Sequence, residues 1–106
     1  MGIEPVLVDE IVRRVLSVAQ PDRIILFGSA LTDSMERDSD IDLLVIEPSP
    51  SDPRQHSVKI RRALRGMGYP FDIIVMGADW FEQTKAVIGG IAYPANKYGR
   101  VIYERG

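Results

Sequence analysis

Residues 23–47 read RIILFGSALTDSMERDSDIDLLVIE and contain the two motifs around which the rest of the chain is organised. An apolar run at residues 24–27 leads directly into Gly28-Ser29. After ten further residues a second apolar run opens with Asp40-Ile41-Asp42. Side chains two positions apart on a strand leave the same face, about 7 Å apart. Both carboxylates are therefore predicted to project together from the start of a strand.

Each motif has a structural and a functional interpretation. Gly28 lets a ligand approach the backbone closely, and Ser29 can cap a following turn whose N–H groups point at an anion. A strand-to-helix turn with a serine cap explains the same pair. Asp40 and Asp42 fit a divalent-metal site at the mouth of a strand whose remainder is core. The alternative is a turn over residues 38–40 with a solvated Asp42 beside it.

A third strand is predicted at residues 71–76, and it repeats the arrangement of the second one. Asp72 is an acid at the entrance of an otherwise apolar run, so it is either an exposed edge residue or a third ligand near the first two. Three carboxylates beside an anion cradle fit divalent-metal phosphoryl or nucleotidyl transfer, in which two ions about 4 Å apart act on the attacking and leaving oxygens. The sequence contains no glycine-rich loop with a lysine, which excludes a P-loop NTPase.

The remaining elements are predicted from periodicity and capping patterns. An amphipathic helix covers residues 5–19 and ends at Pro21. Asp52 and Gln55 open a helix that runs to about residue 67, and Asp79 and Glu82 open a shorter one at residues 80–87. The core residues expected from the 53–67 helix are Val58, Ala63, Leu64 and Met67. A last short helix begins near Pro94 and ends at Gly99, and an edge strand follows at residues 101–103.

The helix at residues 53–67 is rich in cations. They are Arg54, Lys59, Arg61, Arg62 and Arg65. A solvated face explains them, because cations near a helix C-terminus are favoured by the helix dipole. The same residues could bind phosphate or the acidic face of a partner. His56 is the single histidine of the sequence, and with no other histidine or cysteine nearby it is interpreted as a surface residue.

Composition places the chain among ordinary globular proteins. With 106 residues, of which 45 % are hydrophobic, one domain spanning residues 1–106 is expected. The lack of cysteine excludes disulfides, a thiolate nucleophile and cysteine-ligated zinc. No apolar run approaches the roughly 20 residues that span a bilayer, so a cytoplasmic protein without membrane contact is expected. The net charge of −2 disfavours nucleic acid as a direct substrate.

The combined spacing of Gly28-Ser29 and Asp40-Ile41-Asp42, with Asp72 on the next strand, resembles the signature of the polymerase-beta-like nucleotidyltransferase superfamily. The order of elements, the short length and the ending Gly99-Arg100-Val101-Ile102-Tyr103-Glu104 are similar to the minimal nucleotidyltransferases of bacteria and archaea. The resemblance covers essentially the whole chain. It implies an α/β (α+β) fold with a small mixed β-sheet flanked by helices.

The resemblance also implies a reaction and a site. Asp40 and Asp42 would bind Mg²⁺, with two ions expected, and Asp72 would bind metal or act as general base toward the acceptor. The nucleotide-binding residues would be Gly28, Ser29 and Ser39. The reaction would transfer a nucleoside monophosphate, AMP from ATP, to a hydroxyl with release of pyrophosphate.

Minimal members of the superfamily are similar to antitoxins that work with a small helical HEPN-type ribonuclease, in some cases by adenylylating one of its tyrosines. A nucleoside triphosphate, a HEPN-type protein partner and a toxin–antitoxin role are therefore implied here. Many relatives have an arginine-rich turn after Gly-Ser, whereas this chain has Ala30-Leu31-Thr32-Asp33-Ser34. A second hypothesis is thus a non-catalytic antitoxin or subunit that acts by binding its partner. A polymerase or tRNA-modifying role is disfavoured by the charge and by the lack of an accessory helical domain.

Overall fold

A four-stranded mixed sheet forms the centre of the molecule. The computed structural model of the chain describes residues 5–28 and 40–105. The strands are β1 (Arg23–Phe27), β2 (Ile41–Glu47), β3 (Phe71–Gly77) and β4 (Arg100–Glu104). Their order in the sheet is β3-β2-β1-β4; β2 and β3 are parallel, and β1 is antiparallel to β2 and β4. The expected small mixed sheet flanked by helices is confirmed, including the C-terminal edge strand.

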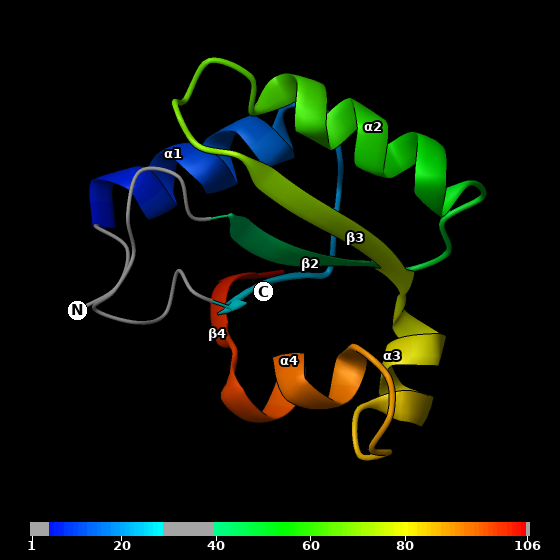
Figure 1. Ribbon diagram of the computed structural model, residues 1–106. Helices are drawn as coiled ribbons and strands as arrows, with labels where there is room; N and C mark the ends of the chain where they lie inside the picture. Colours follow the sequence, from blue (N-terminus) through cyan, green and yellow to red (C-terminus); the bar gives the residue numbers. More distant parts are fainter. Residues whose placement is uncertain (1–4, 29–39, 106) are drawn as a thin grey trace.

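Two pairs of helices cover the two faces of this sheet (Figure 1). Helices α1 (Pro5–Leu16) and α2 (Pro53–Ala63) lie on one face, and α3 (Ala78–Thr84) and α4 (Ala92–Tyr98) lie on the other. Alternate residues of β2 serve the two layers: Leu43 and Val45 pack under α1 and α2, whereas Leu44 and Ile46 pack against α3 and α4. The unbroken apolar runs in β1 and β2 therefore reflect burial on both faces.

The structure moves several predicted helix ends. Helix α1 ends at Leu16, three residues earlier than expected. Helix α2 ends at Ala63, and Gly66, with φ of +93°, follows it in a conformation that a helix cannot continue through. The Asp52 cap is confirmed, because its Oδ1 accepts a hydrogen bond from the Gln55 N–H at 3.1 Å.

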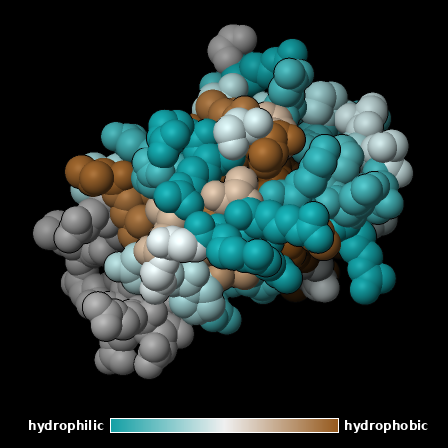
Figure 2. All heavy atoms as spheres, turned by 90° about the horizontal axis from the view of Figure 1, so that it is seen from above, coloured by the Kyte–Doolittle hydropathy of each residue, from teal (hydrophilic) through white to brown (hydrophobic). Residues whose placement is uncertain are grey.

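Two local predictions were wrong. The capping box at Asp79 and Glu82 does not form, because α3 starts at Ala78 after Gly77 and has no side-chain cap. Val58 is 40 % exposed rather than buried, and Ile60 is the residue of α2 that is fully buried. The helix phase thus turns Val58 outward among the cations. Figure 2, which looks down on the α1–α2 side, shows hydrophilic side chains over much of this surface. In the described part of the chain, no helix is long and apolar enough to cross a membrane.

Candidate active site

Two of the predicted acids are direct neighbours at one end of the sheet. Asp42 is the second residue of β2 and Asp72 the second residue of β3, and the parallel register pairs them. Adjacent strands lie about 4.8 Å apart, and side chains at paired positions leave the same face. Asp40 directly precedes β2, two positions before Asp42. The fold therefore gathers all three acids at the sheet end where β2 and β3 begin.

The closeness of the three acids affects the pKa of Asp42. Asp42 is partly buried, whereas Asp40 and Asp72 are exposed. Burial raises the pKa of the Asp42 carboxyl above its usual range, and the negative charges of Asp72 and Asp40 raise it further. Asp42 is thus a carboxylate whose ionised form is disfavoured by its own surroundings. A cation bound beside it would relieve that cost.

Gly28 closes the site from the side of β1. It follows Phe27, which pairs with Asp42 across the antiparallel β1–β2 ladder. Gly28 has φ of +80°, and a Cβ added there would collide with the Asp42 Oδ2 oxygen. Both the backbone conformation and the lack of space require glycine. The Asp42 side chain thus lies directly against Gly28, and the expected approach of a ligand to this backbone stays a prediction. The predicted residues Ser29 and Ser39 lie outside the described residues.

The acids fit a magnesium site in which the protein supplies only one or two of the ligands. Across residues 5–28 and 40–105, no group of three or more acidic, histidine or cysteine side chains is arranged to hold a metal ion by itself. Magnesium commonly takes only one or two protein carboxylates and completes its shell with water and substrate phosphates. The paired Asp42 and Asp72, with the raised pKa of Asp42, match that kind of site.

A pocket of about 480 Å³ adjoins two of the acids. It lies between the C-terminal end of α2 and the start of β3. Its lining comprises Asp40, Arg61, Leu64, Arg65, Tyr69, Pro70, Phe71 and Asp72. Sequence reasoning did not connect the α2 cations with the acids, because the contact depends on how α2 packs on β3. The available signal was that the helix and the third strand are joined by a short break containing Gly66, Gly68 and Pro70.

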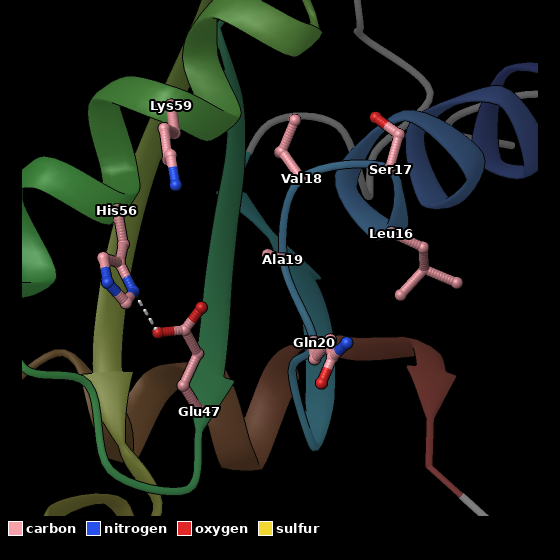
Figure 3. Close-up of a pocket in the computed structure, with 8 residues that line it drawn as sticks. All are labelled: Leu16, Ser17, Val18, Ala19, Gln20, Glu47, His56 and Lys59. Carbon is pink, nitrogen blue, oxygen red and sulfur yellow. Dashed lines mark hydrogen bonds and ion pairs between the residues drawn. The ribbon is translucent and has the colours of Figure 1, made fainter.

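A second pocket, of about 390 Å³, lies at the other end of β2 (Figure 3). There the buried Glu47 carboxylate lies 2.6 Å from His56 Nδ1, and the residues after α1 form the opposite wall. His56, interpreted as a surface residue from sequence, is in fact only 32 % exposed and joins α2 to β2. Glu47 lies five positions after Asp42 on β2, a distance of about 17 Å along the strand. This pair therefore stabilises the fold at a distance from the acids.

A mixed sheet with helices on both faces and acids at the mouths of two parallel strands defines the class of polymerase-beta-like α+β domains. The family model described as "Nucleotidyltransferase domain" matches residues 8–93. This match covers most of the chain, from α1 to the beginning of α4, so the chain belongs to the nucleotidyltransferase domain family of the polymerase-beta-like superfamily. Its general activity is nucleotidyl transfer. A comparison with curated proteins gave no match.

Proposed function

We propose that this protein is a magnesium-dependent nucleotidyltransferase that moves AMP from ATP to a hydroxyl on a protein. The observation that carries the proposal is the in-register pairing of Asp42 and Asp72 beside Gly28, in a chain that belongs to the nucleotidyltransferase family. Adjacent carboxylates at the end of a rigid sheet are suited to hold a divalent cation together with substrate phosphates.

The proposed roles follow from position. Asp40 and Asp42 hold magnesium, and Asp72 holds magnesium or accepts the proton of the acceptor hydroxyl. Bound magnesium would supply charge stabilisation at the attacking and leaving oxygens. The nucleotide contacts are assigned to Gly28, Ser29 and Ser39. Gly28 serves by leaving room at the end of β1, because any larger side chain would displace Asp42.

The reaction is a single displacement at phosphorus. The acceptor hydroxyl loses its proton to Asp72, and its oxygen forms a bond to the α-phosphorus of ATP. The bond between that phosphorus and the β,γ-pyrophosphate breaks, and pyrophosphate leaves. The sheet holds Asp42 and Asp72 in fixed register, so the two acids meet the reacting groups without rearrangement of the backbone.

The acceptor is proposed to be a tyrosine of a small helical HEPN-type partner, which gives the protein an antitoxin role. This assignment rests on the resemblance to minimal nucleotidyltransferases. It is tested by incubating the protein with a purified HEPN-type protein, ATP and magnesium, and measuring the intact mass of the HEPN-type protein. A gain of one AMP that requires magnesium and is lost in Asp42→Asn supports the proposal. Partner binding without any mass gain, equal in wild type and Asp42→Asn, would instead support a non-catalytic antitoxin.

A further inference from the structure

The cations of α2 differ from most of the other described arginines and lysines in one respect. Elsewhere several form ion pairs: Arg13 and Arg14 with Glu10, Arg23 with Glu104, Lys85 with Glu82, and Arg105 with Asp22. Among the described residues, no acid lies within ion-pair distance of the five side chains on and just after α2. These five are Arg54, Lys59, Arg61, Arg62 and Arg65. Their charges are therefore available to a ligand.

Two of these cations lie in the pocket beside the acids. Arg61 and Arg65 are exposed and line the pocket of about 480 Å³ that also contains Asp40 and Asp72. Arg61 lies in the last turn of α2, and Arg65 follows two positions after the helix ends at Ala63, so both reach the same pocket. Neither arginine forms an ion pair with an acid in the described part of the chain. Each guanidinium keeps its donors for a carboxylate or phosphate.

The order of the strands places this pocket opposite the glycine turn. Across the sheet end, Gly28 follows β1, Asp42 lies on β2 and Asp72 on β3. The pocket extends from Asp72 toward the end of α2, and Gly28 is not among its lining residues. If the triphosphate lies at the turn after β1, as proposed above, the acids separate it from the arginine pocket. Because Asp40 and Asp72 line the pocket together with Arg61 and Arg65, an acceptor bound at the arginines lies beside the acids.

We propose that Arg61 and Arg65 form an acceptor subsite that selects an acidic protein segment carrying the reactive hydroxyl. This inference rests on the proposed function, because it assumes that the acids at the sheet end are the reaction centre. Carboxylates two residues apart on an extended segment leave the same face, so two of them can meet two cations that line one pocket. The half-buried Tyr69 and Phe71 give the segment an apolar wall.

A protein segment fits this pocket better than the backbone of a nucleic acid. The chain has a net charge of −2, and the arginines share their pocket with two acids. A continuous row of phosphates would meet that negative charge, whereas a peptide can place its acids only beside the arginines. Specificity for the segment would thus come from two local charge pairs.

The test measures peptide binding directly. A fluorescein-labelled tyrosine peptide flanked by glutamates is compared with the same peptide carrying glutamines, by fluorescence anisotropy at low salt. Wild type is expected to bind the glutamate peptide about tenfold more tightly, a preference of about 1.4 kcal/mol. The double variant Arg61→Ala/Arg65→Ala is expected to lose this preference. The matched control Arg54→Ala/Arg62→Ala removes the same charge from the same helix and is expected to keep it.

Several outcomes would overturn the proposal. They are equal binding of both peptides by wild type, equal loss in the two double variants, or tighter binding of a single-stranded RNA than of the glutamate peptide. The wild-type comparison needs no variant, so it remains decisive if Arg61→Ala/Arg65→Ala fails to fold. Binding is also measured with Asp42→Asn. Retained peptide preference without any AMP transfer by wild type would refute the proposed reaction and leave the subsite standing, whereas transfer without peptide preference would refute the subsite alone.

Discussion

Replacing Gly28 by alanine is expected to abolish function, whereas its effect on stability should be no larger than that of alanine at Gly66. Gly28 has φ of +80° and Gly66 has φ of +93°, so a side chain at either position is strained. Such strain costs about 1–3 kcal/mol, and each kcal/mol lowers the unfolding temperature of a domain this size by roughly 4–8 °C. Gly66 has no atom within 4 Å of the added Cβ, whereas at Gly28 the Cβ would collide with Asp42 Oδ2.

The collision should change the folding stability little but should displace a carboxylate of the candidate site. The Asp42 carboxylate is the end of a rotatable side chain, so it can turn away with little further loss of stability. Turning away displaces it by roughly 1 Å, and a misplacement of that size costs about 100-fold in rate. Gly28→Ala and Gly66→Ala should therefore unfold at similar temperatures, but only Gly28→Ala should lose nucleotidyl transfer.

Thermal unfolding with ATP and magnesium measures stability and ligand binding in one experiment, and pyrophosphate release measures the transfer itself. Ligand at 100 times its dissociation constant stabilises the folded state by about 2.7 kcal/mol. Wild type and Gly66→Ala should show this magnesium-dependent shift, and Gly28→Ala should not. A shift retained in Gly28→Ala, or lost in Gly66→Ala as well, would show that the contact of Gly28 with Asp42 does not control ligand binding.

Three further predictions concern stability. Asp42→Asn should stabilise the metal-free protein at neutral pH, because burial and the charges of Asp72 and Asp40 raise the pKa of Asp42 in the folded state. The Asp42 carboxylate then binds a proton more readily in the folded state than in the unfolded chain. The extra stability of Asp42→Asn over wild type should therefore shrink as the pH falls through the raised pKa toward the ordinary value of 3.8. Urea unfolding of both proteins from pH 7 to pH 3 measures this difference in stability, and a difference independent of pH would contradict the prediction. His56→Ala should lose about 1–3 kcal/mol in urea unfolding because it removes a partner from the buried Glu47 carboxylate, while the magnesium-dependent shift with ATP should persist, since the pair lies at the other end of β2. Asp52→Ala should lose about 0.5–2 kcal/mol through the missing cap of α2, and an unchanged midpoint would show that the cap contributes nothing.

Most of the fold was predictable because local rules and tertiary packing agree. Short apolar runs between turn or polar residues identified all four strands, and the acids at the starts of β2 and β3 stood out against those runs. Helix ends were less predictable. Helix α3 begins at Ala78 because β3 extends to Gly77 and the chain turns there, which leaves Asp79 inside the helix. The capping pattern at Asp79 could not show where the preceding strand would end.

The candidate site was predictable in its members and not in its arrangement. The spacing within the second strand placed Asp40 and Asp42 together, because alternation along a strand is a local property. The partnership of Asp42 with Asp72 required β2 and β3 to be parallel and in register, and the α2 crossover between them decided that. The approach of Gly28 to Asp42 likewise depended on the antiparallel pairing of β1 with β2.

The sequence by itself thus determined the class of fold, the strands and the three acids, since each depends on periodicity and composition over a few residues. Only the tertiary structure decided which residues meet across the sheet and around α2. It placed two of the exposed cations, Arg61 and Arg65, in one pocket with Asp72, and it joined His56 to Glu47. Such contacts join segments far apart or of unknown register in the sequence, so they depend on helix phase and strand pairing, which are set by packing of the whole core.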